Sequence, residues 1–284
     1  MFYKKWFYIE KPVWNNEFSF EQRKNKKLYV PEIIDLDIWD LDKIEIQDNL
    51  DNIAFEDFGF DDKLSTNYGL KNFYRIKIKW KEIILFDNHN HAFYFWYEAR
   101  NRWIIWDNNT LIHIDEHADT RDNNKHLLKP DSFDLEKVFS FTNEVLNVGD
   151  YIIPALEEWI ISEIIQIRNT QNLEDYISKY YWDENVLDIW FIEWRLPESQ
   201  FENQIGPVSE WNKLNSKMFH KNWIILNLDL DFFQKELDFI DYDLKKKVIR
   251  DTFEKSSFIT VSTSPFFIQQ ELAIKVFKDL FLDL

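Results

Sequence analysis

The sequence predicts a three-layer α/β/α fold with a central, mainly parallel sheet, and three observations support this fold class. Short apolar runs alternate along the chain with segments of helical periodicity. Runs such as EIILF are apolar after their first residue, as strands buried on both faces are. Several runs end in a polar cluster that leads into the next helical segment. This alternation is typical of a parallel sheet covered by helices on both sides.

The same pattern gives the individual elements. Strands are expected at residues 82–86, 110–114, 188–195, 223–228 and 258–263. Helices are expected at residues 91–101, 151–168 and 266–284, and Pro154 is acceptable in the first turn of the second helix. Residues 198–221 have the character of a long surface excursion. Because the chain shows no repeat and no low-complexity linker, we expect one domain over residues 1–284.

Composition excludes several classes of protein. The net charge of −17 disfavours a nucleic-acid partner and favours a cationic ligand or a basic peptide. The absence of cysteine excludes disulfides, zinc–thiolate sites and thiol nucleophiles. No run reaches the roughly 20 apolar residues of a membrane span and no signal-peptide pattern is present, so we expect no membrane partner and a cytoplasmic protein. Glycine-rich phosphate-binding loops are also absent.

One cluster of possible metal ligands follows the run at 110–114. Asp115, His117 and Asp119 are spaced two residues apart. In extended chain, alternate side chains point to the same side, so three ligand groups would converge. Carboxylate and imidazole together suit Mn, Fe or Zn better than Ca or Mg.

Two further clusters follow other apolar runs. Asp229 and Asp231 follow residues 223–228, and two carboxylates aimed the same way repel unless a cation lies between them. Taken alone, such a pair is more often a helix cap or a solvated loop. His89 and His91 follow the run at 82–86. Ligands of parallel α/β sheets bind beyond the carboxyl ends of the strands, so the three clusters together predict a metal site there.

These residues resemble a known family. A His that opens a helix, then Asp-x-His-x-Asp, then Asp-x-Asp is the order found in metal-dependent ureohydrolases, such as arginase and agmatinase, and in their deacetylase relatives. The chain is most similar to a divergent branch labelled UPF0489, which includes peptide arginases of ribosomal-peptide biosynthesis. The similarity covers about residues 80–284 and is carried by HNHAFYFW, HIDEHADT, NVGDYIIPAL, LNLDLDFF and TVSTSPFFI.

The resemblance implies an arginase-like fold and two Mn²⁺ ions. The implied ligands of one ion are His91, Asp115, Asp119 and Asp229. Those of the other are Asp115, His117, Asp229 and Asp231, so that Asp115 and Asp229 bridge. Two ions about 3.5–4 Å apart can share a water and deprotonate it near neutral pH. Asp119 would orient the resulting hydroxide.

The chain departs from the arginase pattern at the substrate-binding positions. No His stands in the stretch that matches the family's substrate-binding loop, and His126 and Asp150 are the candidates nearby. Asp150 is equally well explained as a helix cap. Ser262 stands where arginases place the Glu that holds the guanidinium, and Glu271 is the candidate to replace it, although a solvated helix face is its simpler interpretation.

The resemblance therefore implies an enzyme that hydrolyses the guanidinium of arginine within a precursor peptide, giving ornithine and urea. Residues that hold the amine and carboxylate of free arginine are not recognisable, which favours a peptide substrate. Two alternatives stay open. One is another metal-dependent amidohydrolase on the same frame, either a deacylase or a small-guanidine ureohydrolase. The other is a peptide-binding module whose metals are structural, although a shared open position has no use in a structural site.

Overall fold

An eight-stranded sheet forms the centre of the computed structural model, which describes residues 2–12, 23–59, 62–168, 191–195, 223–234, 242–282 and 284. The strand order is β10-β9-β8-β11-β12-β7-β6-β3. All neighbours from β10 to β7 pair in parallel, β6 pairs antiparallel with β7, and β3 pairs in parallel with β6. In this order along the sheet, the strands are Phe191–Arg195, Ile161–Arg168, Asn109–Ile114, Ile224–Asp229, Phe258–Ser262, Lys81–Phe86, Phe73–Ile78 and Ile33–Asp37.

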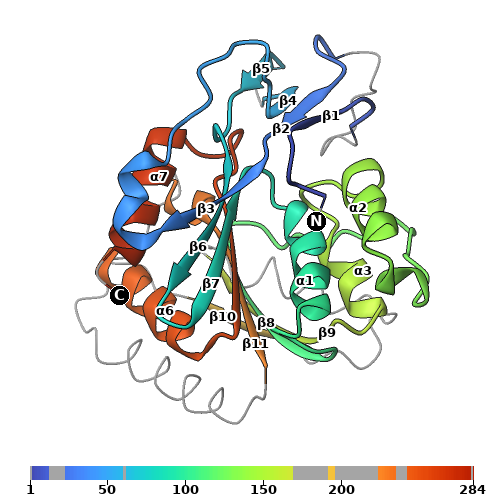
Figure 1. Cartoon of the computed structure of the whole chain (residues 1–284), viewed down its shortest axis with the longest axis vertical. Helices are drawn as coiled ribbons and strands as arrows, with labels where there is room; N and C mark the ends of the chain where they lie inside the picture. The colour runs from blue at the N-terminus through green and yellow to red at the C-terminus, as the bar shows by residue number, and fades with distance from the viewer. Residues whose placement is uncertain are drawn as a thin grey trace.

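Helices cover both faces of this sheet, as Figure 1 shows. One face carries α1 (His91–Asn101), α2 (Leu135–Glu144) and α3 (Ile152–Glu157). The other carries α6 (Tyr242–Lys255) and α7 (Gln270–Phe281). The predicted three-layer fold with a mainly parallel sheet is therefore confirmed. Among the described helices, none has the length and apolar character needed to cross a membrane.

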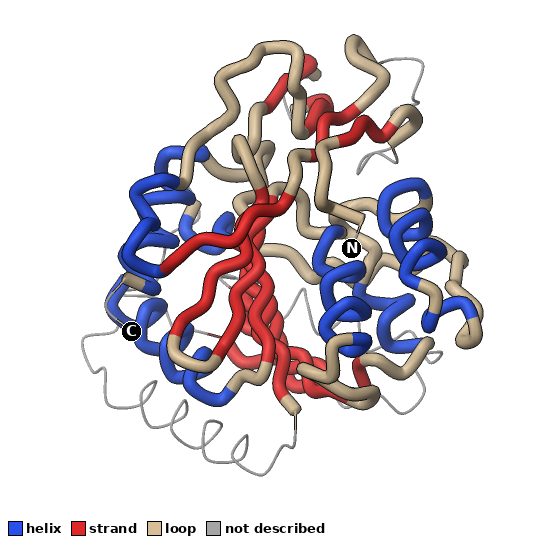
Figure 2. Tube along the Cα trace, in the orientation of Figure 1, coloured by secondary structure: helices blue, strands red, loops and turns tan. Residues whose placement is uncertain are grey.

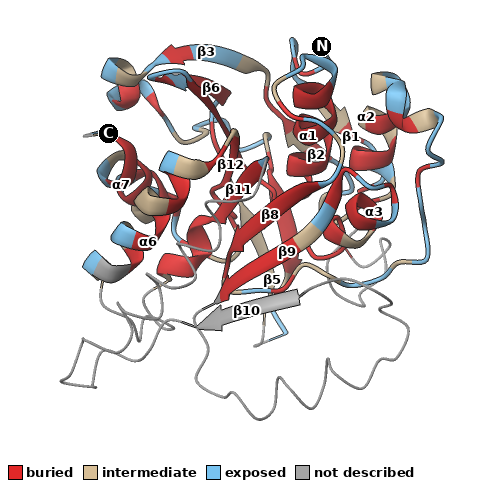
Figure 3. Cartoon of the chain, turned by 90° about the horizontal axis from the view of Figure 1, so that it is seen from below, coloured by how far each residue is buried: buried red, intermediate tan, exposed pale blue. Residues whose placement is uncertain are grey.

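The inner strands of the sheet contribute to two separate cores, because successive side chains point to opposite faces. In β8, Leu111 packs in the core under α1, whereas Ile112 and Ile114 pack in the core under α6 and α7. Figure 3 shows the consequence, since the inner strands are buried along their whole length. Such strands read as continuous apolar runs, which is why they are visible in the sequence.

The first 80 residues belong to the same structure although they carry no recognised motif. They supply β3 and β6 at one edge of the main sheet. They also form two antiparallel pairs, β1 (Phe7–Ile9) with β2 (Leu28–Val30), and β4 (Phe55–Phe58) with β5 (Leu64–Asn67). Figure 2 shows both pairs together beyond one end of the main sheet.

The predicted helix at 151–168 is wrong in its second half. The helix α3 ends at Glu157, Trp159 adopts a left-handed φ of 67°, and Ile161–Arg168 is strand β9. The Ile-rich run pairs with β8 on one side and β10 on the other, and this sheet environment favours β-branched side chains over a helix.

Two other boundaries differ from the prediction. The last helix begins at Gln270 rather than at 266, because residues 265–268 form turns. Of the strand expected at 188–195, the described part is Phe191–Arg195. The predicted surface excursion at 198–221 lies outside the described residues.

Candidate metal centre

Two neighbouring strands bring the central carboxylates together. Leu228 of β11 pairs with Ile114 of β8 in parallel register, so Asp229 and Asp115 follow at adjacent strand ends. The Oδ1 atom of Asp229 accepts a hydrogen bond from the backbone N of Asp231 at 3.1 Å. This bond caps the 3-10 turn η4 (Leu230–Phe233) and keeps both carboxylates at the same end of the sheet.

The chain turns sharply after β8 and places two more groups, His117 and Asp119, around this point. Asp115 Oδ1 accepts a hydrogen bond from the backbone N of His117 at 2.5 Å. Gln166 of β9 donates from Nε2 to the His117 carbonyl at 2.8 Å. Asp119 adopts a left-handed φ of 51°, which is uncommon for a non-glycine residue and tends to mark functional sites.

His89 is the histidine that joins the carboxylates after β7. Its Nδ1 atom lies 3.1 Å from Oδ2 of each of Asp115, Asp119 and Asp229. The assignment of His91 to this cluster needs correction. As the first residue of α1, His91 points into the aromatic core, where its Nδ1 lies 2.8 Å from the Tyr3 hydroxyl and burial lowers its pKa to about 3.

The donor atoms form two groups that share Asp115. His89, His113 and Asp115 make one group, and Asp115, His117 and Asp231 make the other, with the ligand atoms of each group within 4.8 Å of one another. His117 Nδ1 lies 2.9 Å from Asp231 Oδ2. The sequence interpretation missed His113, although its spacing of two residues from Asp115 on the same strand was the available signal.

The electrostatics of the cluster indicate crowded negative charge. Burial and then the charge of Asp115 raise the pKa of Asp119 to about 7. Burial, with the charges of Asp229 and Asp115, raises the pKa of Asp231 well above its ordinary value. Burial would lower the pKa of His89, but Asp229 and the other carboxylates outweigh it and raise that pKa. Four carboxylates cannot ionise side by side without compensating positive charge, and two divalent cations would balance them.

The polar atoms of the cluster fit divalent metal ions. His89 Nδ1, Asp115 Oδ2 and Asp231 Oδ2 are buried and have no aligned hydrogen-bond partner among the described residues. Buried polar groups are nearly always satisfied, so such orphans call for an ion or a water. Imidazole nitrogens and carboxylate oxygens are the donors that Mn, Fe and Zn accept.

Two serines support the cluster from the end of β12. Ser264 has a left-handed φ of 43°, and its hydroxyl donates to Asp229 Oδ2 at 2.5 Å. Ser262, which pairs with Asp229 in the sheet, donates to the carbonyl of Asp87 at 2.5 Å and lies 2.9 Å from the Ser264 hydroxyl. The hydroxyl of Ser262 is therefore engaged within the protein.

Two of the predicted substrate residues lie elsewhere. His126 is half-exposed and forms an ion pair with Glu157, at the end of α3 that leads to the start of β9. This is the opposite end of the sheet from the cluster, so the catalytic assignment of His126 needs correction. The buried carboxylate of Asp150 accepts hydrogen bonds from Asn147 and Asn123, which explains it as a loop-ordering group. It does not line the pocket described next.

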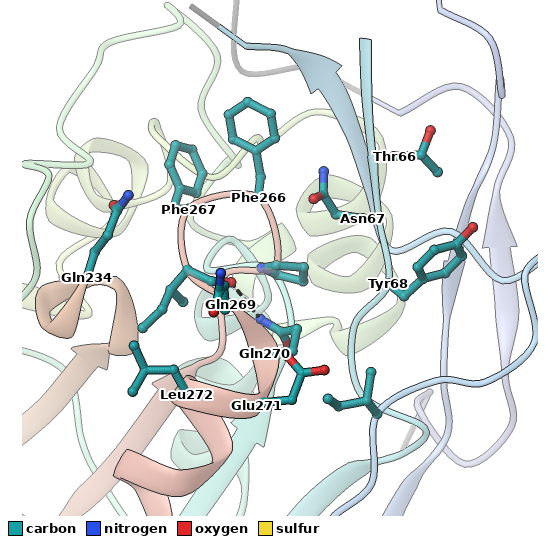
Figure 4. A pocket seen from close by; sticks show the side chains of 13 residues that line it. Thr66, Asn67, Tyr68, Gln234, Phe266, Phe267, Gln269, Gln270, Glu271 and Leu272 are labelled. Atoms are coloured by element: carbon teal, nitrogen blue, oxygen red, sulfur yellow. Dashed lines mark hydrogen bonds between the residues drawn. The ribbon is translucent and has the colours of Figure 1, made fainter. Parts of the chain in front are cut away.

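A pocket of about 530 Å³ opens beside the cluster. The Phe267 ring forms part of its wall and packs against the His117 ring, with ring centroids 5.0 Å apart. Figure 4 shows Phe266 and Phe267 on one side and the residues 66–68 across from them. Glu271, in the first turn of α7, also lines this pocket and is solvent-exposed. Glu271 therefore lines the same pocket as Phe267, the residue that packs against the candidate ligand His117.

Comparison with known proteins gives a structural likeness only. No protein-family model and no curated protein sequence matches the chain. The arginase of Bacillus caldovelox superposes with a TM-score of 0.44 at 13% identity, over 70% of this chain and 68% of that one. The agmatine ureohydrolase of Thermoplasma volcanium superposes with a TM-score of 0.41 at 16% identity, over 70% of this chain and 60% of that one.

The fold and the site together define the class of this protein. It is a three-layer α/β protein with a mainly parallel sheet and a cluster of carboxylates and imidazoles at the carboxyl ends of its central strands, buried except for the half-exposed His117. The donor set of this cluster suits two divalent cations that share Asp115.

Proposed function

We propose that this chain is a dinuclear metal hydrolase that cleaves the guanidinium group of arginine within a peptide. The observation that carries the proposal is the pair of donor groups that share Asp115 at the strand ends. Two ions bound there would supply a water of lowered pKa as the nucleophile. Mn²⁺ is the proposed metal, as in the family that the motifs resemble.

The reaction adds the elements of water across one C–N bond. The water oxygen joins the guanidinium carbon, and the bond from this carbon to the arginine Nε breaks. Nε leaves as the amine of ornithine after taking a proton, and the second product is urea. Asp119 is the proposed group that accepts the proton of the attacking water and passes it to Nε, since it is buried within the cluster, 3.1 Å from His89 Nδ1.

Glu271 is the proposed partner of the guanidinium. A guanidinium offers donors in a planar fork and pairs best with a carboxylate. The Glu271 carboxylate lines the pocket beside His117 and has no ion-pair partner among the described side chains. Ser262 cannot supply this charge, and its hydroxyl is already engaged with Asp87.

The lining of the pocket and the net charge of the chain favour a peptide over a free amino acid. Its walls come from Ile46, from residues 66–68 at the end of β5, from residues 265–272, and from Gln234 just after η4. These walls carry apolar rings and amide groups, which suit the side chains and backbone of an extended segment. The net charge of −17 would attract a basic precursor peptide.

Mass spectrometry tests this function. Protein loaded with Mn²⁺ is incubated with an arginine-containing peptide, free arginine or agmatine, and with Asp115→Ala as the control. The expected result is loss of the elements of cyanamide from the peptide, release of urea, and much slower turnover of the two small guanidines. Comparable turnover of free arginine would leave an ordinary ureohydrolase. Two bound ions without turnover of any guanidine would leave the deacylase or the binding module.

A further inference from the structure

The first turn of α7 lies on the wall of the pocket beside the candidate metal centre and carries uncapped main-chain N–H groups. The first hydrogen bond of this helix runs from Ala273 N to Gln269 O at 3.0 Å, and the side chain of Gln269 does not cap the helix. The N–H groups of Gln270, Glu271 and Leu272 therefore have no acceptor among the described residues. All three residues line the pocket, as Figure 4 shows.

The side chain of Gln270 adds a buried acceptor at the same place. Gln270 is 7% exposed, and its Nε2 atom donates to the carbonyls of Thr263 at 2.7 Å and Ile268 at 3.4 Å. Because both neighbours are carbonyls, the nitrogen must face them, and this fixes the orientation of the amide. The Oε1 atom is left without a donor in the described part of the chain. Buried acceptors are nearly always satisfied, so this oxygen calls for a donor from a ligand in the pocket that Gln270 lines.

These groups match the main chain of an extended peptide. In an extended residue, the N–H and the C=O point to the same side, as they do when a strand pairs with its neighbour. The C=O of such a residue can accept from the first turn of α7 while its N–H donates to Gln270 Oε1. Recognition of this kind does not depend on the side chain of the bound residue.

The charge of the pocket wall favours a neutral carbonyl over an anion. The N-terminus of a helix carries partial positive charge, which by itself also suits phosphate or carboxylate. Here the exposed carboxylate of Glu271 lies in the same turn, and the net charge of the chain is −17. Both repel an anion, whereas a peptide carbonyl satisfies the N–H groups without carrying charge.

We propose that the first turn of α7 binds the main chain of the peptide substrate at a residue next to the modified arginine. One peptide carbonyl accepts from the N–H groups of the turn, and one peptide N–H donates to Gln270 Oε1. Phe267 lines the same pocket and packs against the candidate ligand His117, so this subsite is close to the metal centre. The proposal rests on the peptide part of the proposed function and is independent of the identity of the metal.

A side-chain cap tests the role of the N–H groups. In Gln269→Ser, the hydroxyl can accept from the N–H of Glu271 or Leu272 and would compete with the peptide. This variant should melt about 2 °C higher than Gln269→Ala, which removes the same side chain without adding a cap. Its KM for the arginyl peptide should nevertheless be about tenfold higher than that of Gln269→Ala, with equal metal content and kcat. Higher stability with an equal KM would overturn this proposal and leave the proposed function intact.

Ester analogues of the peptide give a second readout with the wild-type protein. Replacing one backbone amide by an ester removes its N–H without adding bulk. Calorimetry measures binding of the ornithine product peptide to Mn²⁺-loaded protein, with one ester at a time in the residues that flank ornithine. One position should weaken binding by about fivefold or more, and the others should have little effect. Equal binding of all the esters would overturn the proposal, and a wild type that turns over free arginine but no peptide would overturn the proposed function together with it.

Discussion

Asp115 differs from the other carboxylates of the cluster because its two oxygens face different groups. Its Oδ1 atom accepts from the His117 backbone and lies 3.6 Å from His117 Nδ1. Its Oδ2 atom lies 3.1 Å from His89 Nδ1. Asp231 differs in this respect. Among the cluster histidines of the described chain, its one close neighbour is His117, whose Nδ1 lies 2.9 Å from Asp231 Oδ2. Asp115 therefore belongs to both donor groups, whereas Asp231 belongs only to the group that contains His117.

This asymmetry predicts different metal losses. Asp115→Ala should lose both ions, because each group loses an oxygen donor. Asp231→Ala should lose mainly the ion of the His117 group. Metal analysis after Mn²⁺ loading and buffer exchange measures the stoichiometry, and circular dichroism checks the fold of each variant. Two ions retained by Asp115→Ala would contradict the shared position.

Glu271 lines the pocket and is not one of the candidate metal ligands, so its replacement should affect turnover without affecting metal binding. Glu271→Gln should keep both ions and the fold but lower kcat/KM for the arginyl peptide on the order of 100-fold, the scale of a lost charge-assisted pair at roughly 3 kcal/mol. Glu136→Gln, at an exposed position in the first turn of α2, is the matched control. Near-normal turnover by Glu271→Gln would show that another group holds the guanidinium.

The contact between α1 and the end of α3 shows how a whole element depends on a buried acid. Glu158 follows α3, is buried, and accepts a hydrogen bond from the Tyr97 hydroxyl of α1 at 2.8 Å. Burial raises the pKa of Glu158 from 4.5 to about 7. The folded state therefore retains a proton that the unfolded state releases, and this stabilisation is lost as the pH rises from about 4.5 to about 7.

Replacement of Glu158 should remove this pH dependence. Gln cannot titrate and still offers an oxygen to Tyr97. Relative to the wild type, Glu158→Gln should gain about 1–2 kcal/mol in the free energy of unfolding between pH 5 and pH 8. Urea unfolding at both pH values measures the difference, with Glu144→Gln at an exposed position of α2 as the control. An unchanged difference at the two pH values would show that Glu158 ionises freely in the folded protein.

For the whole molecule, the cluster couples metal binding to stability. The cluster residues come from the ends of β7, β8 and β11, so an ion held there links three strands of the central sheet. Binding to the folded state alone stabilises it by about 2.7 kcal/mol at a free metal concentration of 100 times Kd. The same ion relieves the repulsion among four buried carboxylates.

Chelation should therefore lower the melting temperature of the wild type, and added Mn²⁺ or Zn²⁺ should restore it. Asp115→Ala should show no such dependence. Differential scanning calorimetry with and without chelator makes the comparison at constant ionic strength, since the net charge of −17 also responds to salt. A melting temperature that is independent of metal in the wild type would contradict binding of ions that bridge these strands.

The sequence by itself determined the elements whose signals are local. Strands β7, β8, β11 and β12 and helix α1 lie within one or two residues of their predicted ranges, because buried parallel strands are continuous apolar runs. The polar clusters at their ends follow from the same reasoning, since parallel strands deliver their carboxyl ends to one edge. Five of the six residues predicted as ligands, Asp115, His117, Asp119, Asp229 and Asp231, meet at that edge.

The tertiary structure decided whatever depends on partners far away in the chain. His89 and His91 are alike in sequence, and the choice between them is made by Tyr3, which is 88 residues from His91 and binds it in the aromatic core. Strand β9 exists because β8 and β10 flank an Ile-rich run that would also suit a helix. The His113 ring is buried between the cluster, 3.2 Å from Asp115 Oδ2, and Asn227 of β11, which is 114 residues away and lies 3.1 Å from its Nδ1. The spacing of residues in the sequence determines on which face of a strand each side chain lies. Only the packing of the folded chain determines which distant residue that side chain contacts.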